Sequence, residues 1–120
     1  MRIFIVEDSP QICERLIELI EADGKHVVLG CADTYDAAVE GIGEATPDVG
    51  IFDIRLREGS GIDAFAVAKR RFPDLVGIIL SSNVTGQYMA ASADAGAAYV
   101  LDKSRDFERI PEILGVLSNS

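Results

Sequence analysis

The chain has 120 residues, which fits one domain and leaves little room for a second. Hydrophobic residues make up 48% of the sequence, which argues against a disordered chain. The formal net charge of −9 predicts an acidic surface that repels nucleic acid and anionic lipid, so we expect no direct nucleic-acid binding. No apolar stretch approaches the roughly 18 residues of a membrane helix, and no basic flank precedes a cleavage site, so we expect a soluble cytoplasmic protein with no membrane contact.

Apolar runs alternate with amphipathic segments along the whole chain. The apolar runs predict five strands, at residues 2–6, 26–31, 48–52, 75–80 and 97–101. The segments after them predict five helices, at about 10–23, 34–44, 60–72 and 84–95, and from about 110. Pro111 is incompatible with a regular helix that begins at 104, so we expect only an irregular first turn near 105–109.

Capping residues mark several of the predicted helix starts. Ser9 followed by Pro10 is typical of an N-cap with proline at the first helical position. Asp33 with Asp36 resembles a capping pair for the second helix, and Ser60 opens the third helix as a variant of the capping box. Five strands alternating with five helices predict an α/β fold with right-handed crossovers. We expect a flavodoxin-like, doubly wound parallel sheet in the order 2-1-3-4-5, covering residues 1–120 as one domain.

Two cysteines lie far apart in the sequence. Cys13 falls in the first predicted helix and Cys31 in the second predicted strand, and they form no C-x-x-C motif. We interpret them as two small buried hydrophobic side chains in a reducing compartment.

Polar side chains with a shared chemistry follow four of the five strands. Glu7 and Asp8 follow the first strand, Asp53 the third, Ser81 the fourth, and Lys103 closely follows the fifth. In a parallel sheet of the expected order these four strand ends lie side by side, at the edge where such sheets bind ligands. Clustered carboxylates repel one another unless a hard divalent cation relieves the repulsion, so a metal site is favoured over a solvated surface. A carboxylate, a hydroxyl and a lysine beside a metal also suit a phosphoryl group.

These residues resemble those of the receiver domain of two-component response regulators, over essentially all 120 residues. The segment from Asp53 to Asp63 is similar to the family's acceptor segment, and Ala95-Gly96-Ala97 before the last strand is also typical. The resemblance implies that a sensor histidine kinase or phosphotransfer protein donates a phosphoryl group to Asp53, with Mg²⁺ or Mn²⁺ as the cofactor.

The resemblance also assigns a role to each site residue. Asp8, Asp53 and the backbone carbonyl of Arg55 would hold the metal directly, and Glu7 would act mostly through water. Lys103 and Ser81 would neutralise the transferring group together with the metal, which is mainly electrostatic catalysis. Because side chains alternate along a strand, we expect Ser81 rather than Ser82 to face the phosphoryl group. We expect no separate substrate turnover and therefore no enzyme in the ordinary sense.

Phosphorylation would then change the face formed by the fourth helix, the fifth strand and the fifth helix, for a downstream protein partner. The resemblance also allows a homodimer to form on phosphorylation. We expect a stand-alone regulator rather than an excised receiver, because no linker follows the last predicted helix. The alternative function is a pseudo-receiver that binds a protein partner without being phosphorylated. A flavin-binding electron carrier is disfavoured, because acidic Glu7 and Asp8 would repel the cofactor phosphate.

The chain departs from the family pattern around its fifth strand. Ser104 stands where the family usually has a proline after the lysine, so we expect a trans peptide there. Val100 stands at the family's switch-aromatic position and Tyr99 lies one residue earlier, so Tyr99 replaces the aromatic only if the strand is irregular. We have no account from the sequence of Asp102 beside Lys103.

Two further positions, Arg55 and Asn83, tune the lifetime of the acyl phosphate in the family. Arg55 either shields the phosphate or pairs with Glu58, and the sequence does not fix the direction of its effect.

Overall fold

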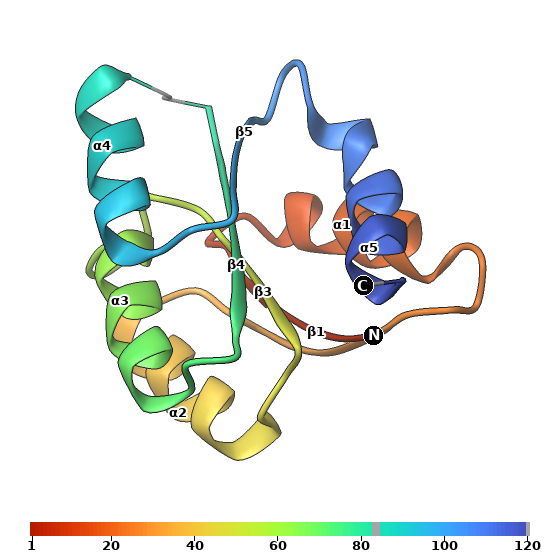
Figure 1. The fold of residues 1–120 in the computed structure, drawn as a ribbon, viewed down its shortest axis with the longest axis horizontal. Helices are drawn as coiled ribbons and strands as arrows, with labels where there is room; N and C mark the ends of the chain where they lie inside the picture. Colours follow the sequence, from red (N-terminus) through yellow and green to blue (C-terminus); the bar gives the residue numbers. More distant parts are fainter. Residues whose placement is uncertain (83–84, 120) are drawn as a thin grey trace.

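A computed structural model of the chain describes residues 1–82 and 85–119. Five parallel strands form one sheet in the order β2-β1-β3-β4-β5 (Figure 1). The elements in chain order are β1 (Arg2–Val6), α1 (Pro10–Glu21), β2 (Val27–Ala32), α2 (Tyr35–Ala45), β3 (Val49–Phe52), α3 (Gly61–Arg71), β4 (Val76–Ser81), α4 (Gly86–Ala95), β5 (Tyr99–Asp102), a 3₁₀ turn (Phe107–Arg109) and α5 (Ile110–Ser118). The predicted α/β class, the strand order 2-1-3-4-5 and the five helices are confirmed.

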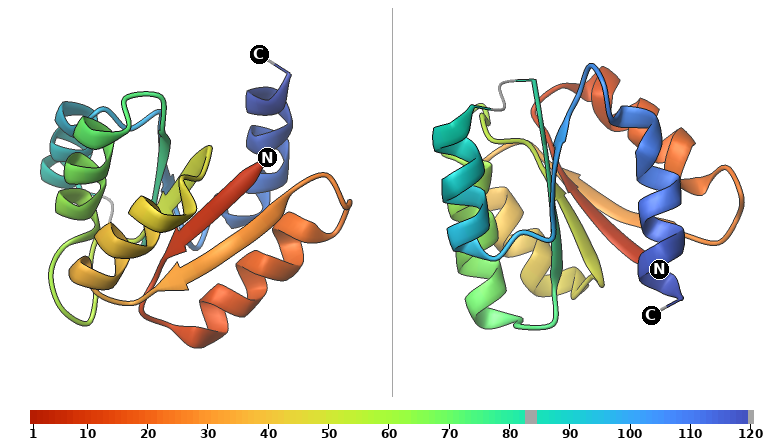
Figure 2. Two further views of the ribbon diagram at one scale, coloured as in Figure 1. Left: turned by 90° about the horizontal axis from the view of Figure 1, so that it is seen from below. Right: turned by 45° about the horizontal axis from the view of Figure 1, so that its top comes forward.

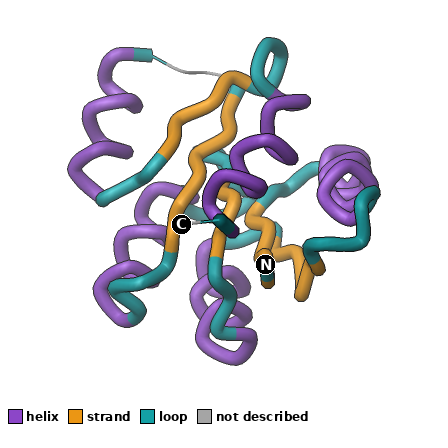
Figure 3. The backbone as a smooth tube through the Cα atoms, turned by 45° about the vertical axis from the view of Figure 1, so that its right-hand side comes forward, coloured by secondary structure: helices purple, strands orange, loops and turns teal. Residues whose placement is uncertain are grey.

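The sheet is the middle of three layers (Figures 2 and 3). Helices α1 and α5 cover one face, where Leu16 and Ile113 pack against strand residues such as Ile5. Helices α2, α3 and α4 cover the other face, where Ile42 and Phe65 belong to a second hydrophobic cluster. Because both faces are covered, the central strands β1, β3 and β4 are apolar almost throughout, as parallel strands in doubly wound folds are. None of the helices in residues 1–82 and 85–119 has both the length and the apolarity needed to cross a bilayer.

Side-chain caps begin helices α1 to α4, and one cap differs from the prediction. Ser9 accepts a hydrogen bond from the backbone N–H of Ile12, as expected for the start of α1. At α2 the cap is Thr34, whose hydroxyl accepts from Ala37 N, and the prediction of Asp33 was one residue early. The Asp33 carboxylate instead lies on the surface and pairs with the guanidinium of Arg57 at 3.2 Å.

Strand β5 begins two residues later than predicted, whereas α5 begins where it was predicted. Gly96 closes α4 with φ at +96°, and the N–H of Ala97 still donates to the carbonyl of Ser92 in the helix. The N–H of Ala98 is the first to donate to β4, at Gly77 O, and β5 begins at Tyr99 rather than at 97. The 3₁₀ turn before α5 and the start of α5 at Ile110 confirm the irregular first turn expected from Pro111. Helix α4 begins at Gly86, and the expected start at residue 84 lies outside the described residues.

The prediction of two unpaired cysteines was wrong. Cys13 in α1 and Cys31 in β2 form a disulfide, with their Cα atoms 6.9 Å apart. Helix α1 packs beside the edge strand β2, so residues distant in sequence become neighbours. Cys13 is buried, as expected, but Cys31 is exposed.

Candidate functional site

The ends of four neighbouring strands form one edge of the sheet. Val6 at the end of β1 is level with Phe52 at the end of β3, and Phe52 is level with Ile79 in β4. Strands β4 and β5 continue this register to their last residues. The structure therefore brings Glu7, Asp8, Asp53, Ser81 and Lys103 to the same edge, because each lies at or just after a strand end.

Asp53 is held in place by its backbone and by two bonds to its carboxylate. Its N–H donates to the carbonyl of Val6 at 2.8 Å, which continues the sheet by one residue. The Oδ1 atom accepts from the N–H of Ile54 at 2.8 Å, and Oδ2 accepts from Lys103 Nζ at 2.9 Å. The residue is 8% exposed, so one open side of a nearly buried carboxylate faces the site.

A glycine makes room for the Asp53 backbone. A β-carbon at Gly61 would lie 1.6 Å from the carbonyl oxygen of Asp53, which no real side chain tolerates. The first residue of α3 therefore has to be glycine for the end of β3 and the helix to approach this closely. This requirement gives a physical reason for the glycine in the Ser60-Gly61 pair after the loop that follows β3.

Lys103 joins two carboxylates from different strands. Its Nζ lies 2.5 Å from Glu7 Oε1 and 2.9 Å from Asp53 Oδ2. The other Glu7 oxygen accepts from the backbone N–H of Ser9 at 3.0 Å, so Glu7 is fixed at both oxygens. Burial raises the pKa of Glu7 above its ordinary value, and the nearby Asp53 charge adds to this, although Lys103 and Ser9 oppose it. Burial alone would lower the pKa of Lys103, but the bonds to Glu7 and Asp53 outweigh it and raise that pKa.

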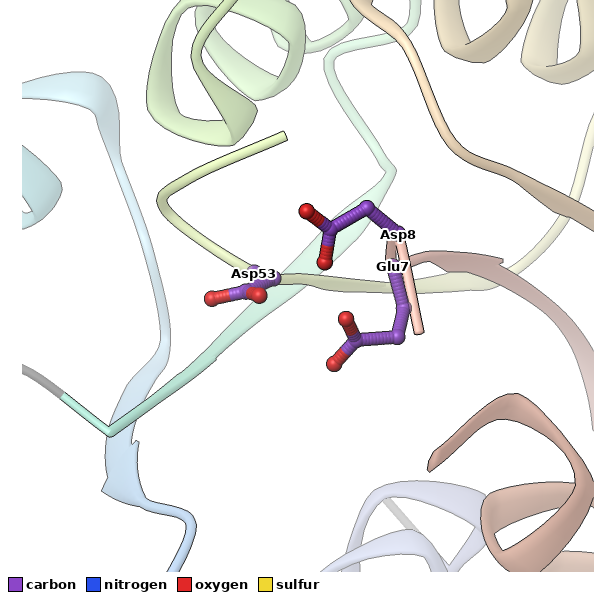
Figure 4. Close-up of side chains that lie close together, drawn as sticks. All are labelled: Glu7, Asp8 and Asp53. Atoms are coloured by element: carbon purple, nitrogen blue, oxygen red, sulfur yellow. The ribbon is translucent and has the colours of Figure 1, made fainter. Parts of the chain in front are cut away.

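Three carboxylates lie close together at the ends of β1 and β3 (Figure 4). Glu7, Asp8 and Asp53 each offer an oxygen, and these oxygens lie within 4.8 Å of one another. Glu7 and Asp53 are buried, whereas Asp8 is exposed and leaves the site open to water. An all-oxygen donor set with access to water fits Mg²⁺ or Mn²⁺, which keep several waters when bound to proteins. Arg55, whose carbonyl was assigned to the same site, lies in the exposed loop after β3 and forms an isolated bridge with Ser60.

The two adjacent serines, Ser81 and Ser82, differ in their burial. Ser81 is the last residue of β4 and is 2% exposed, and its carbonyl accepts from Lys103 N at 3.0 Å. Ser82 is exposed. The structure therefore ties Ser81, rather than Ser82, to the segment that carries the lysine. Asn83 lies outside the described residues.

Asp102 is a structural residue of the site that the sequence left unexplained. Its Oδ1 atom accepts from both the N–H of Ser104 at 2.8 Å and the Ser104 hydroxyl at 2.6 Å. Its backbone N–H donates to Asp106 Oδ2 at 3.0 Å, and its carbonyl accepts from Arg105 N and Asp106 N. The bonds from Ser104 lower the pKa of Asp102. Asp102 thus organises the turn after Lys103 where the family uses proline, and no cis peptide occurs in residues 1–82 or 85–119.

Strand β5 is regular, so Tyr99 does not take the position of the missing aromatic. Tyr99 pairs with Ile78 and packs with the hydrophobic cluster between the sheet and helices α1 and α5. Val100 pairs with Ile79 and packs with the cluster between the sheet and helices α2, α3 and α4. No register shift separates β4 from β5. Val100 is therefore on the face of the sheet that α4 covers, and the expected offset of Tyr99 is confirmed.

Comparison with known proteins agrees with this fold and site. The family model described as the response regulator receiver domain matches residues 3–115. A DNA-binding transcriptional activator, DevR/DosR of Mycobacterium tuberculosis, is 32% identical over 109 residues, which cover 90% of this chain and 50% of the activator. A protein-glutamate methylesterase/protein-glutamine glutaminase of a Nocardioides species is 31% identical over 102 residues, which cover 85% of this chain and 28% of that protein. The chain belongs to the response regulator receiver domain family.

Solved structures give the same answer for the fold. A two-component response regulator of the LuxR family from an Aurantimonas species superposes with a TM-score of 0.88 at 25% identity, covering 98% of this chain and 85% of that one. The response regulator domain of Thermotoga maritima CheB superposes with a TM-score of 0.85 at 24% identity, covering 99% and 94%. The chain spans about half the length of the first curated relatives that it matches. The match covers only 28% of the methylesterase relative, so most of that protein lies outside it.

Proposed function

We propose that this receiver domain, over residues 1–120, is a phosphoryl-accepting signalling switch with Asp53 as the acceptor. The observation that carries the proposal is the position of Lys103, whose ammonium group bridges Glu7 and Asp53 beside three converging carboxylates. A lysine in this position neutralises carboxylate before transfer and phosphoryl oxygen after it. A bound divalent cation would supply the remaining positive charge.

Each residue has a defined task in this proposal. Asp53 Oδ2 now accepts from Lys103, and this bond would pass to a phosphoryl oxygen once the acyl phosphate forms. The Ser81 hydroxyl is the switch hydroxyl that bonds the phosphoryl group. Asp8, Asp53 and the Arg55 carbonyl would hold Mg²⁺ or Mn²⁺, and Glu7 would act through water, in agreement with its Lys103 pairing. The chain assists its own phosphorylation and dephosphorylation, without turnover of a separate substrate.

The proposed partners act at two places on the molecule. A sensor histidine kinase or a phosphotransfer protein supplies the phosphoryl group in the cytoplasm. A downstream protein responds to the face formed by α4, β5 and α5, through a shift between two conformational populations. The phosphorylated form either remains a monomer or forms a homodimer through this chain.

Acetyl phosphate with Mg²⁺ tests the proposal directly. The wild-type protein is expected to gain the mass of one phosphoryl group in intact-protein mass spectrometry, and Asp53→Asn is expected to gain none. Asp94→Asn is the matched control, because it makes the same change at an exposed carboxylate in the last turn of α4, away from the carboxyl ends of the strands. Labelling retained in Asp53→Asn would remove Asp53 from the acceptor role.

The second candidate function is a pseudo-receiver that binds its partner without phosphorylation. It is favoured by Val100, because an aliphatic side chain replaces the aromatic that couples the hydroxyl to the output face. Under this alternative the unmodified chain binds its partner fully. A partner pull-down with and without a phosphoryl mimic such as beryllofluoride separates the two functions, since only the switch changes its capture.

A further inference from the structure

The disulfide lies in the wall of the acidic site. A hollow of about 440 Å³ between the start of α1 and the end of β2 is lined by Glu7, Asp8, Cys13 and Cys31. The proposed phosphoryl chemistry uses Glu7 and Asp8 of this hollow but neither of its cysteines. The disulfide therefore remains without a role beside the carboxylates of the proposed metal site.

Both sulfur atoms approach the same atom of the site. The carbonyl oxygen of Glu7 lies 3.7 Å from Cys13 Sγ and 4.0 Å from Cys31 Sγ. A disulfide sulfur carries no hydrogen, so these contacts can become S–H···O hydrogen bonds only when the pair is reduced. Oxidation therefore exchanges two weak bonds to the Glu7 backbone for a covalent bond between the elements beside it.

Those two elements flank the segment that carries the carboxylates. Cys13 belongs to the first turn of α1, where its N–H donates to Ser9 O at 3.0 Å. Cys31 precedes Ala32, whose carbonyl accepts from Glu7 N at 2.8 Å. The disulfide and the Glu7 N–Ala32 O hydrogen bond together close a ring that contains residues 7–13, and this ring restricts how far the acidic segment moves away from β2.

The two cysteines also differ in access, which fixes the order of the chemistry. Cys31 is exposed, whereas Cys13 is 8% exposed. The Cys31 thiolate attacks a low-molecular-weight disulfide, forms a mixed disulfide and releases one thiolate of that molecule. The Cys13 thiolate then attacks Cys31 Sγ and releases the second thiolate. The protein loses two hydrogen atoms in all, and the small disulfide is reduced to two thiols that take up the protons.

We propose that Cys13 and Cys31 form a reversible redox site that sets the affinity of the adjacent carboxylates for a divalent cation. The inference rests on the metal site of the proposed function and on its cytoplasmic location, where disulfides are typically transient and redox-sensing. Glu7, Asp8 and Asp53 repel one another, so ordering them costs free energy when a cation binds. The oxidised ring has already restricted this segment, so less of that cost remains and the oxidised form binds the cation more tightly.

Mn²⁺ titration of the full chain in two redox states tests the inference. One sample is oxidised with glutathione disulfide and the other is reduced, with the reagents removed before titration, and mass spectrometry verifies the loss of two hydrogen atoms. Free Mn²⁺ is followed by electron paramagnetic resonance. The oxidised protein is expected to bind Mn²⁺ at least about fivefold more tightly, which is the low end of coupling between two sites.

Cys31→Ser is the matched variant, because it removes the exposed thiol without disturbing the core. Its Mn²⁺ affinity is expected to equal that of the reduced wild type under both treatments, and Cys13→Ala gives a second reading from the buried side. Equal affinity in the two wild-type states overturns this inference alone, and so does a glutathione adduct that never closes to the internal disulfide. Absence of Mn²⁺ binding in both states overturns the inference together with the metal part of the proposed function.

Discussion

Glu7 shows how one side chain can work against the stability of the fold that positions it. It is 3% exposed, and its charge is balanced by Lys103 while Asp53 adds a second negative charge nearby. Burial is the largest of the effects that raise the pKa of Glu7 above 4.5. The site therefore holds an ionised carboxylate in a place that favours the protonated form, as metal and catalytic sites often do.

The pH dependence of stability follows from the direction of this shift. Below about pH 4.5 Glu7 is protonated in both the folded and the unfolded chain and costs nothing. As the pH rises through its higher folded pKa, the folded chain must ionise a buried group and loses stability. Without metal, Glu7→Gln is therefore expected to unfold at the same urea concentration as the wild type at pH 4. At pH 7 it is expected to be more stable, by about 1.4 kcal/mol for each unit of raised pKa.

Glu14→Gln is the control for this series, because it removes the same charge from an exposed position of α1. Its stability relative to the wild type is expected to change little with pH over the same range. A difference between Glu7→Gln and wild type that is flat from pH 4 to pH 8 would show that the Glu7 pKa is not raised in the folded protein.

Two glycines at different places in helices are expected to respond in opposite ways to substitution by alanine. At Gly61 the first residue of α3 lies against the Asp53 carbonyl, whereas a β-carbon at Gly115 in α5 would meet no atom within 4 Å. Gly61→Ala is expected to destabilise the protein by about 3 kcal/mol and to weaken Mn²⁺ binding, because the helix must move away from Asp53. Gly115→Ala is expected to stabilise it by up to about 1 kcal/mol, since alanine favours the helix.

Urea unfolding followed by circular dichroism measures both changes, and the Mn²⁺ titration reports on the site. Gly115→Ala is also the matched control, because it makes the same chemical change in a helix away from the strand ends. Wild-type stability in Gly61→Ala would mean that the close approach of α3 to Asp53 relaxes at little cost.

The elements show which parts of the molecule a sequence can predict. The strand order and the meeting of four strand ends follow from apolar runs and crossover rules, so the positions of Asp53 and Lys103 were predictable from their places after strands. The Cys13–Cys31 pair was missed because contact between α1 and the edge strand leaves no periodic signal in the sequence. The role of Asp102 was missed because bonds from Ser104 depend on a turn whose geometry no pattern specifies.

At the scale of the whole molecule, the net charge of −9 and the acidic site act on stability in different ways. Long-range repulsion among surface carboxylates is screened by any salt. One oxygen of each of Glu7, Asp8 and Asp53 lies within 4.8 Å of the others. This distance is shorter than the screening length of ordinary salt, so added salt relieves their repulsion poorly. A cation bound among these oxygens relieves it directly, and it also stabilises the folded state by mass action.

MgCl₂ and NaCl at equal ionic strength are therefore expected to raise the melting temperature by different amounts. At a Mg²⁺ concentration 100-fold above its dissociation constant, binding adds about 2.7 kcal/mol to the free energy of unfolding. MgCl₂ should then raise the melting temperature by roughly 10 °C more than NaCl does for a chain of this size, and this difference is the surplus due to binding. Asp8→Asn is expected to lose most of the surplus without breaking the Lys103 ion pairs, because those pairs use Glu7 and Asp53. Glu40→Gln, at an exposed position of α2 outside the acidic hollow, carries the same change in net charge and is expected to keep the surplus. If the two variants lost it equally, the effect of Mg²⁺ would belong to the charge of the whole molecule, and the three converging carboxylates would not act as a site.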